Sequence, residues 1–436
     1  MKLSAVRLGG LVLGFLAFVS ACSYALDAPH TLHHSKQTSQ HISGSAHAHS
    51  HHRSMARRSA HRAGRGRGIV SKRTTAHARA RRRSSVQSQA SVRTVRVRTR
   101  HRYYERFTAS SFVTTPVGEG DVTVGEDPLV RQAAIDALGD MNGTAVVINP
   151  ANGRILAMVN QKLALSPGAE PCSTIKLSVA LAALSEGLVT RDTMVQLPGF
   201  RMNMTQAIAH SNNLYFEELG RELGFERVRH YANEFGLGEL AGYLIPGEQL
   251  GVYPDHPIPA SEGGVGRMCS FGQGVSMTPL QLGALVAAIA NGGTLYYLQH
   301  PTTPEQIASF QPRVKRKLDI ARFVPDLQDG MAGAVDYGTA RRLHLNFQEF
   351  PVFGKTGTCS DKGTRFGWFA SYSETPLGNL VTVFFLEGGR PTFGPRAAEL
   401  TGEFYKNLWD RNYFAGKDQQ TAIVAAPATS VTQAAQ

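Results

Sequence analysis

The segments with strand-like sequence lie in two distant parts of this 436-residue chain, and their separation limits the folds open to it. GTAVVINPANGRILAMVN, residues 143–160, holds two apolar runs joined by the turn sequence NPANG. Three more apolar runs follow one another within residues 349–389: EFPVFGKTGTCS, TRFGWFASYS and GNLVTVFFLEGG. Mainly helical sequence separates the two groups. We therefore expect an α/β fold with a central antiparallel sheet of about five strands, flanked by helices, plus an all-helical subdomain.

Helical patterns mark the limits of this domain. In DPLVRQAAIDALGD the apolar residues have helical spacing, and Asp127 followed by Pro128 is typical of the start of a helix. NNLYFEELGRELG and TPLQLGALVAAIANGG are typical of helices in the middle of the chain, and a closing helix is expected at about 395–410. These patterns predict one folded domain at residues 126–412 and a disordered tail at residues 413–436.

A strongly basic segment precedes the predicted domain. Residues 28–104 contain 18 Lys or Arg, no Asp or Glu, and 11 of the 16 His residues. Without these charges the formal net charge of +13 becomes about −5, so the rest of the chain is mildly acidic. Large apolar side chains are too few to offset the entropy of ordering, which predicts a disordered linker at residues 26–125. No stacking aromatics are interleaved with the charges, which argues against nucleic acid and favours a solvated linker or contact with an anionic envelope surface.

The first 25 residues have the order of a secretory signal. Lys2 and Arg7 precede the apolar stretch LGGLVLGFLAFVSA, which is short for a helix that spans a bilayer. Cleavage after Ala25 and lipidation of Cys22, in the lipobox-like sequence VSAC, are both open, with an uncleaved anchor as a further alternative. Each route places the chain outside the cytoplasm, in the periplasm or the cell envelope.

Three short motifs carry candidate chemistry. STIK places Ser173 three residues before Lys176, so the two side chains share a face if this segment is helical. A buried Lys near other cations can lose its proton and act as the base for a serine. Ser173 is also typical of a helix N-cap, so this motif alone leaves both interpretations open. SNN at residues 211–213 and KTGT at residues 355–358 follow in order, and the ordered set is far harder to obtain by chance than any one motif.

The ordered set resembles the motifs of penicillin-binding proteins and class A β-lactamases. FGQGVSMTPLQLGALVAAIANGG is similar to the segment before the third motif of penicillin-binding transpeptidases, GWFASYSETP to the strand and turn after it, and LIPGEQLGVYP to their Pro-Gly-Glu loop. The resemblance covers about residues 143–410. It implies a serine D,D-transpeptidase or D,D-carboxypeptidase that forms an acyl-enzyme with D-Ala-D-Ala stem peptides of peptidoglycan. It also implies covalent inhibition by β-lactams, with no metal and no cofactor.

The resemblance further implies a role for each polar motif residue. Ser173 would be the acylated nucleophile, and Lys176 would be the base that takes its proton. Ser211 would relay a proton to the leaving amine, and Asn213 would bind an amide of the substrate. Lys355 would hold Ser211 in a positive field.

The KTGT strand would supply the rest of the implied site. Thr356 and Thr358 would offer their hydroxyls to a terminal carboxylate, and Gly357 would let the substrate backbone lie close along the strand. The backbone N–H groups of Ser173 and Thr358 would form the oxyanion hole, because they would face the charge that develops in the tetrahedral state.

A disulfide between Cys172 and Cys359 is another implication of the resemblance. If the family fold is present, the helix start and the KTGT strand face each other, and the two cysteines come within the Cα separation of a cystine. Some class A β-lactamases with carbapenem-hydrolysing activity are similar in carrying a cystine at these two motif-relative positions. An oxidising compartment would let the bond persist, whereas two small buried thiols that merely pack are the alternative. Cys269 is expected to stay unpaired.

Two other functions remain as alternatives. A serine β-lactamase of class A needs a Glu-activated water, and EQLG at Glu248 lacks the Asn of that motif, which argues against this alternative. The other is a catalytically inactive wall-binding module, and the intact Ser173, Lys176 and Lys355 argue against it. Transpeptidase and carboxypeptidase differ only in whether an amine or water attacks the acyl-enzyme, and the sequence does not decide between them.

Overall fold

The computed structural model describes residues 107–415 of the chain. The predicted signal segment with Cys22, most of the predicted basic linker and nearly all of the predicted C-terminal tail lie outside the described residues. Within residues 107–415 every helix is too short or too polar to cross a membrane.

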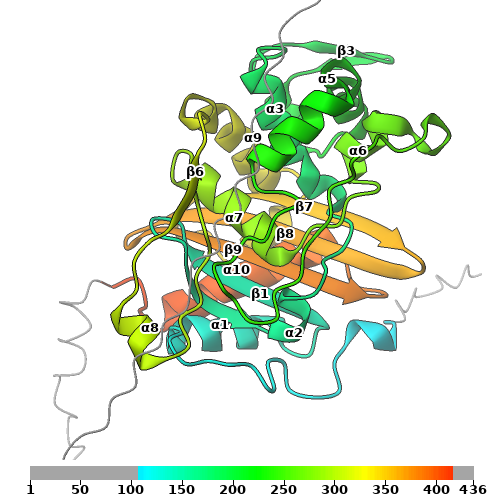
Figure 1. The fold of residues 1–436 in the computed structure, drawn as a ribbon. Coiled ribbons are helices and arrows are strands. Elements are labelled where there is room, and N and C mark those ends of the chain that lie inside the picture. Colours follow the sequence, from blue (N-terminus) through cyan, green and yellow to red (C-terminus); the bar gives the residue numbers. More distant parts are fainter. Residues whose placement is uncertain (1–106, 416–436) are drawn as a thin grey trace, which may run out of the picture. The chain divides into compact units, whose positions relative to one another are not determined.

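A five-stranded antiparallel sheet forms the centre of the described domain, with its strands in the order β2-β1-β9-β8-β7 (Figure 1). The strands are β1 (Gly143–Asn149), β2 (Arg154–Val159), β7 (Val352–Asp361), β8 (Thr364–Thr375) and β9 (Gly378–Gly388). The early pair joins the late three where Val146 of β1 pairs with Val383 of β9. The prediction of an antiparallel sheet closed by distant segments is confirmed. β7 comes last in the order, so one of its edges has no strand partner in this sheet.

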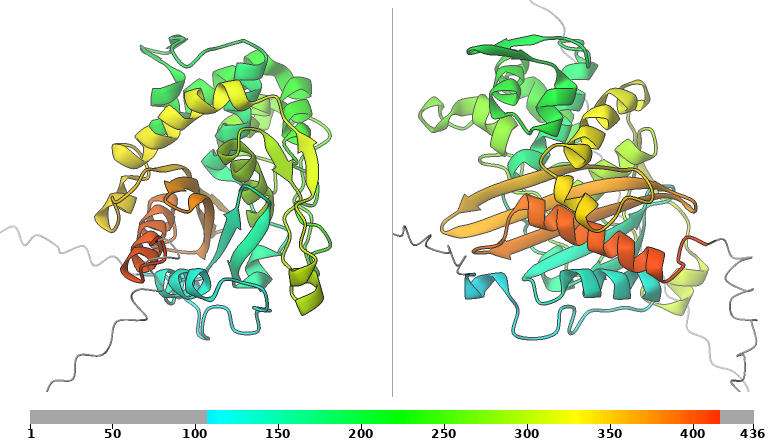
Figure 2. Two further views of the ribbon diagram at one scale, coloured as in Figure 1. Left: turned by 90° about the vertical axis from the view of Figure 1, so that its left-hand side faces the viewer. Right: turned by 180° about the vertical axis from the view of Figure 1, so that it is seen from behind.

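The sheet separates two hydrophobic cores, because alternate residues of a strand point to opposite faces. Val146 packs in one core with α7 (Pro279–Ala290), and Val147 packs in the other with α1 (Pro128–Leu138) and α10 (Gly394–Asp410). α7 is buried on almost every side, which explains its continuous apolar sequence. Figure 2 shows α1 and α10 side by side along one face of the sheet.

A mainly helical subdomain lies above the sheet in Figure 1 and confirms the prediction of a helical second part, to which the structure adds a short ribbon at residues 195–202. Its main helices are α3 (Lys176–Ser185), α4 (Met204–Ala209), α5 (Asn213–Glu234), α6 (Gly264–Phe271) and α9 (Val324–Asp336). α5 starts where the side chain of Asn212 accepts a hydrogen bond from the backbone N–H of Tyr215, and it bends at Gly224, where φ is 74°. The subdomain therefore places the start of α3 and the start of α5 near the sheet.

The remaining elements are short. They are η1 (Ala109–Ser111), α2 (Gln161–Ala164), η2 (Cys172–Ile175), β3 (Val195–Leu197), β4 (Phe200–Met202), η3 (Ala260–Glu262), β5 (Thr294–Tyr296), α8 (Pro304–Ala308), β6 (Val314–Lys317), η4 (Ala321–Phe323) and η5 (Arg341–Leu345). β3 pairs with β4, and β5 pairs with β6, as two small antiparallel ribbons. Strands of this length are too short to show a clear period-2 pattern, so the sequence did not predict them.

Ordered structure extends beyond both predicted domain limits. Residues 107–125, predicted to belong to the disordered linker, pack on the domain: the Asp121 carboxylate is buried and lies 2.7 Å from the Arg131 guanidinium of α1. A buried charge needs such a partner, and the pairing depends on the fold rather than on local pattern. At the other end, residues 413–415 follow α10, and Phe414 is buried in the same core as α10.

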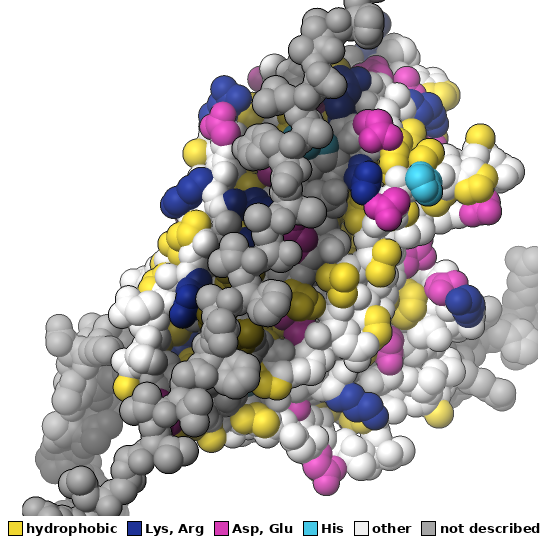
Figure 3. All heavy atoms as spheres, viewed as in Figure 1, with side chains coloured by type: hydrophobic (Ala, Val, Ile, Leu, Met, Phe, Trp, Pro, Cys, Tyr) yellow, Lys and Arg dark blue, Asp and Glu magenta, His cyan; other side chains and the backbone are white. Residues whose placement is uncertain are grey.

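The surface of the domain carries charges of both signs. On the face drawn in Figure 3, the visible Lys and Arg side chains are interspersed with those of Asp and Glu. Apolar side chains lie between them, singly or in small groups. The visible part of this face is therefore not dominated by one sign of charge, in keeping with the mildly acidic balance outside the basic segment.

Candidate active site

Ser173 lies in the short helical turn η2, which runs directly into α3. It does not act as a cap, because neither η2 nor α3 has a side-chain cap and Ser173 Oγ lies 2.9 Å from Lys176 Nζ. Cys172, the residue before it, has φ 51°, a left-handed conformation that costs a residue with a Cβ about 1–2 kcal/mol. Such strain persists only where the surrounding structure enforces it. The turn that presents Ser173 is thus held in place by its neighbours.

Lys176 is fully buried and has four polar neighbours. Its Nζ lies 2.9 Å from Ser173 Oγ, 2.9 Å from the Ser211 carbonyl oxygen, 3.2 Å from the Ser211 hydroxyl and 2.6 Å from Asn213 Oδ1. Carbonyl and amide oxygens only accept hydrogen bonds, and a neutral amine has two N–H groups and one lone pair. When both N–H groups bond to those two oxygens, the lone pair is left for the hydroxyl of Ser173. The contacts therefore suit a neutral Lys176.

Ser211 connects the two buried lysines of the site. It lies between α4 and α5 with φ 55°, and its hydroxyl accepts a hydrogen bond from Lys355 Nζ at 2.8 Å. The three residues of SNN have different contacts. Ser211 and Asn213 meet Lys176, whereas Asn212, which the motif left as a spacer, caps α5.

Lys355 reaches the site from the edge strand β7 and is fully buried. Besides Ser211, its Nζ contacts the carbonyl oxygen of Thr356 at 3.0 Å. Side chains alternate along a strand, so Lys355, Gly357 and Cys359 share the face of β7 that points toward η2. Thr356 and the following Thr358 share the opposite face. The strand therefore offers the site one cation on one face and two hydroxyls on the other.

Burial shifts the titration of both lysines. Burial lowers the pKa of Lys176 well below its ordinary value, the nearby Lys355 ammonium lowers it further, and the Glu217 carboxylate opposes these two effects. Burial also lowers the pKa of Lys355, to about 7. Two protonated amines beside one serine hydroxyl are costly in a dry site, so the pair favours a state with one proton.

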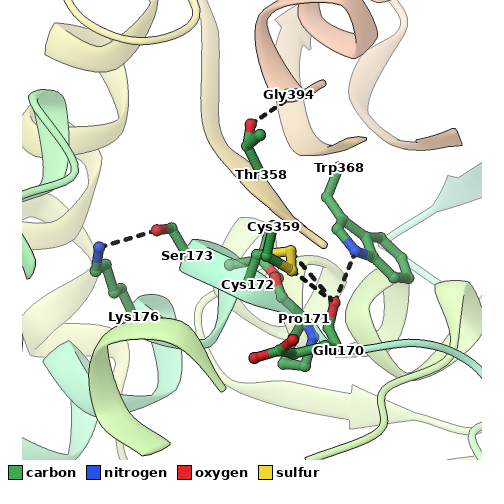
Figure 4. The surroundings of a disulfide bond; sticks show 10 residues. Glu170, Pro171, Cys172, Ser173, Lys176, Thr358, Cys359, Trp368 and Gly394 are labelled. Carbon is green, nitrogen blue, oxygen red and sulfur yellow. Dashed lines mark hydrogen bonds between the residues drawn. A yellow bond between two sulfur atoms is a disulfide. The ribbon is translucent and has the colours of Figure 1, made fainter. Parts of the chain in front are cut away.

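The two threonines of KTGT both bond to protein groups. Thr356 Oγ1 lies 2.6 Å from Thr339 Oγ1, and Thr358 Oγ1 accepts from the backbone N–H of Gly394 at 2.8 Å (Figure 4). Gly394 is the first residue of the 17-residue helix α10, whose N-terminus carries partial positive charge. A hydroxyl group whose oxygen accepts such a bond has a more polarised O–H bond, so it is a stronger hydrogen-bond donor to another group. The exposed Thr358 hydroxyl is thus suited to donate to an anion.

Gly357 lets β7 pass close to the turn that carries Ser173. A Cβ at Gly357 would lie 2.9 Å from the carbonyl oxygen of Pro171 and 3.2 Å from Thr174 Cγ2. These contacts would be too tight for a larger residue. Close packing of β7 against the turn therefore accounts for a glycine at position 357. Its implied role toward a substrate backbone stays a prediction.

Cys172 and Cys359 form a disulfide with their Cα atoms 5.5 Å apart (Figure 4). The bond joins the residue before Ser173 to the residue after Thr358. It thereby ties the turn of the predicted nucleophile to the KTGT strand at the point where the two predicted oxyanion donors lie. Cys269 is free and buried.

Thr339 is a residue of this region that the motifs did not reveal. It lies between α9 and η5, its backbone N–H donates to the carbonyl oxygen of Ala209 at 3.2 Å, and its hydroxyl contacts that of Thr356. Gly338 allows this approach, because a Cβ there would lie 2.1 Å from the Ala209 oxygen. Nothing in the sequence YGTA marks this threonine as a site residue, so only the fold identifies it.

The arrangement forms a continuous chain of polar contacts. Ser173 Oγ, Lys176 Nζ, Ser211 Oγ and Lys355 Nζ follow one another at separations of 2.9, 3.2 and 2.8 Å. Such a chain can move a proton away from one hydroxyl and deliver one at another without a histidine. Among residues 107–415, no group of three or more His, Cys, Asp or Glu side chains is arranged to hold a metal ion.

Comparison with known proteins gives a family and relatives. The family described as Penicillin binding protein transpeptidase domain matches residues 143–406, more than half of the chain. Stage V sporulation protein D of Bacillus subtilis is 30% identical over 257 residues, which cover 49% of this chain and 39% of that protein. Peptidoglycan D,D-transpeptidase MrdA of Acinetobacter baumannii is 25% identical over 353 residues, which cover 65% of this chain and 52% of that protein. Both relatives are longer, and this chain spans about half of their length or less.

Solved structures share the fold. A chain from a structure entitled "Structural coordination of polymerization and crosslinking by a peptidoglycan synthase complex" matches with a TM-score of 0.53 and 25% identity, covering 65% of this chain and 62% of that one. The D,D-transpeptidase domain of a peptidoglycan glycosyltransferase from Eggerthella lenta matches with a TM-score of 0.52 and 20% identity, covering 66% and 82%. The architecture of sheet and helical subdomain is therefore one that transpeptidase domains also have.

Proposed function

The chain belongs to the penicillin-binding protein transpeptidase domain family, and we propose that it is a serine D,D-transpeptidase acting on peptidoglycan stem peptides that end in D-Ala-D-Ala. D,D-carboxypeptidase activity is a close variant of this proposal. The observation that carries it is the buried contact of Lys176 Nζ with both Ser173 Oγ and Ser211 Oγ. The names of the relatives, among them a peptidoglycan D,D-transpeptidase, agree with this class.

The proposed first step is acylation of Ser173. Neutral Lys176 takes the hydroxyl proton while Ser173 Oγ attacks the carbonyl carbon of the penultimate D-alanine. The backbone N–H groups of Ser173 and Thr358 stabilise the oxyanion, since both flank the disulfide that holds the turn against β7. The carbonyl oxygen thereby gains its charge next to donors that are already in place.

Collapse of the tetrahedral state releases D-alanine. Ser211 gives its proton to the leaving amine and receives the proton that Lys176 took from Ser173, so Lys176 returns to its neutral form. Lys355, bonded to the Ser211 hydroxyl at 2.8 Å, stabilises the oxygen of Ser211 while the two transfers take place. An amine of a second stem peptide, or water, then attacks the acyl-enzyme by the same route in reverse.

In this proposal the residues beside the Ser173–Lys176–Ser211–Lys355 contacts orient the substrate. Asn213 holds Lys176 through Oδ1, which leaves its amide N–H groups for a carbonyl of the substrate. In this proposal the terminal carboxylate lies along the free edge of β7, within reach of Lys355 on one face of the strand and of the Thr356 and Thr358 hydroxyls on the other. Peptide substrates and β-lactams share this carboxylate and the adjacent acyl group, so both enter in the same orientation.

A serine β-lactamase is the second candidate, and the disulfide beside Ser173 favours it through the similarity noted for carbapenem-hydrolysing enzymes. Glu248 argues against it, because its carboxylate accepts hydrogen bonds from the backbone N–H groups of Ala241 and Gly242 at 2.9 and 3.0 Å. A carboxylate that accepts hydrogen bonds from two backbone N–H groups fixes the loop that carries them, which is a structural role rather than activation of a water. The proposal therefore includes a slow loss of any penicillin adduct.

The test is to mix the purified protein with benzylpenicillin and follow its intact mass. The proposal expects one added penicilloyl group that persists for minutes, together with release of D-alanine from a stem pentapeptide. Loss of the adduct within seconds would assign the chain to the β-lactamases. Absence of both adduct and D-alanine release would leave only the inactive wall-binding module. Comparing D-alanine release with and without an acceptor amine separates transpeptidase from carboxypeptidase activity.

The segments outside the described residues belong to the proposal as well. Residues 1–25 act as an export signal, with lipidation of Cys22 as the alternative to cleavage, and the protein works in the periplasm or cell envelope. The basic segment contacts an anionic envelope surface, and nucleic acid is not a partner. The domain proposed from sequence, 126–412, is extended here to the ordered range 107–415.

The acylation rate is expected to fall as the pH rises through about 7, because Lys355 then loses the charge that stabilises Ser211. Lys176 must be neutral to act as a base, so its own depressed pKa sets the acid limb, and the profile is bell-shaped. The measurement is the rate of penicillin labelling from pH 5 to pH 10. Lys355→Arg keeps its charge over this range and should move the alkaline limb upward. A wild-type rate that still rises above pH 9 would contradict the assignment.

A further inference from the structure

The turn between α9 and η5 touches both walls of the proposed site. On one side the Thr339 N–H bonds to the carbonyl oxygen of Ala209, two residues before Ser211. On the other side its hydroxyl lies 2.6 Å from that of Thr356, the residue after Lys355. One threonine therefore links the loop of the second motif to the strand of the third.

The Thr339 and Thr356 hydroxyls together have one proton that their mutual hydrogen bond does not use. Thr339 and Thr356 together have two hydroxyl protons, and one of them makes the bond between the two oxygens. Among the described residues neither hydroxyl has another hydrogen-bond partner. With Thr339 as the donor of that bond, the unused proton belongs to Thr356, which is only 4% exposed, and a polar hydrogen buried to this degree ordinarily has an acceptor. Thr356 directly follows Lys355 on the edge strand β7, although its side chain points to the other face, and this nearby cation makes an anion the acceptor that fits best.

We propose that Thr339 is a positioning and specificity-determining residue for the terminal carboxylate of the substrate, acting through Thr356. Thr339 donates its proton to Thr356 Oγ1, and this bond fixes and polarises the Thr356 proton toward the carboxylate. The inference rests on the proposed function, because it takes the carboxylate of a D-Ala-D-Ala peptide or a penicillin as the anion. It adds to that function a residue outside the three motifs.

A role in folding alone predicts a different behaviour. Thr382 and Ser371 form a comparable hydroxyl pair at 2.8 Å, but they lie inside the sheet, on β9 and β8. Both pairs are partly or fully buried, so loss of either hydroxyl should lower the melting temperature. Only for the Thr339 hydroxyl should the effect of its loss on the acylation rate depend on whether the acylating compound carries a carboxylate. Thr382→Val is therefore the matched control.

The experiment compares benzylpenicillin with its uncharged methyl ester as acylating agents of the full-length protein. Thr339→Val should lower the second-order acylation rate constant of the acid roughly tenfold, the loss of one hydrogen bond, and leave that of the ester within about twofold. Thr339→Ser keeps the hydroxyl and should restore the preference for the acid. Thr382→Val should leave the ratio of the two rate constants unchanged. Thr339→Ala removes the hydroxyl together with the methyl group, adds no apolar group in place of the hydroxyl, and replaces the valine variant if that variant does not fold.

Equal losses for acid and ester, or no loss for either, would overturn the role of Thr339 while leaving the proposed function in place. Failure of Thr339→Ser to restore the preference would do the same. A wild-type protein that neither compound acylates would overturn the proposed function, and this inference with it. The wild-type measurement thus distinguishes the two failures.

Discussion

Replacing Ser173 by alanine is expected to abolish covalent labelling by penicillin, with the acylation rate falling by about a million-fold, to below detection. The hydroxyl of Ser173 is the group that faces Lys176 Nζ at 2.9 Å, and alanine leaves no oxygen to attack the β-lactam carbonyl. The measurement is intact-mass spectrometry after long exposure to benzylpenicillin, combined with a melting curve to show that the variant is folded.

The matched control is Ser178→Ala. Ser178 is buried in α3, the helix that continues from the turn of Ser173. Its hydroxyl bonds to the carbonyl oxygen of Ile175 at 2.9 Å, and among residues 107–415 it has no hydrogen bond to a lysine. Its loss should cost some stability and leave labelling intact. Persistent labelling of Ser173→Ala at one site would show that another residue is the nucleophile.

The second large effect is expected for Lys176→Arg, which should slow acylation by roughly 10²–10⁴-fold, the usual contribution of a general base. Arginine keeps the positive charge but does not lose its proton, so it cannot accept the proton of Ser173. The labelling rate with benzylpenicillin, measured near pH 7, provides the test. A rate close to that of the wild type would rule out Lys176 as the base.

Lys355→Arg serves as the control for this substitution. Lys355 is the other fully buried lysine of the site, and the proposal needs its charge rather than its lone pair. Arg at this position retains the charge, so acylation should continue apart from a cost of overpacking. Equal losses in the two variants would mean that size rather than proton transfer limits both.

The sequence predicted those parts of the molecule that are encoded by local pattern. Strand β7 and its KTGT residues stand out because an apolar run surrounds them, and Lys176 lies one helical turn after Ser173 in the chain itself. The family resemblance then implied that three motifs separated by long stretches of chain meet in one place. In the structure Lys176 lies within hydrogen-bond distance of Ser173, Ser211 and Asn213. Lys355 lies within the same distance of Ser211.

The parts that the sequence did not predict depend on contacts between distant segments. Thr339 enters the site only because Gly338 packs against the backbone of Ala209, and no spacing rule connects these positions. In the sequence Asp121 is typical of a polar linker, and only the fold shows that it forms an ion pair with Arg131 of α1. The pKa of Lys355 likewise follows from complete burial, which a short polar motif does not reveal.

The disulfide also sets an order of events during biogenesis. Cys172 and Cys359 are separated by 187 residues, and Cys359 belongs to a strand that joins the sheet only through β8 and β9. In a chain that crosses the membrane from its N-terminus, as we propose, Cys172 emerges long before its partner and meets Cys269 first. Oxidation that outpaces folding would then join the wrong pair. Ser173, the proposed nucleophile, therefore receives its final surroundings only when the last strands have arrived, so in this proposal acylation begins only after most of the chain has been translocated.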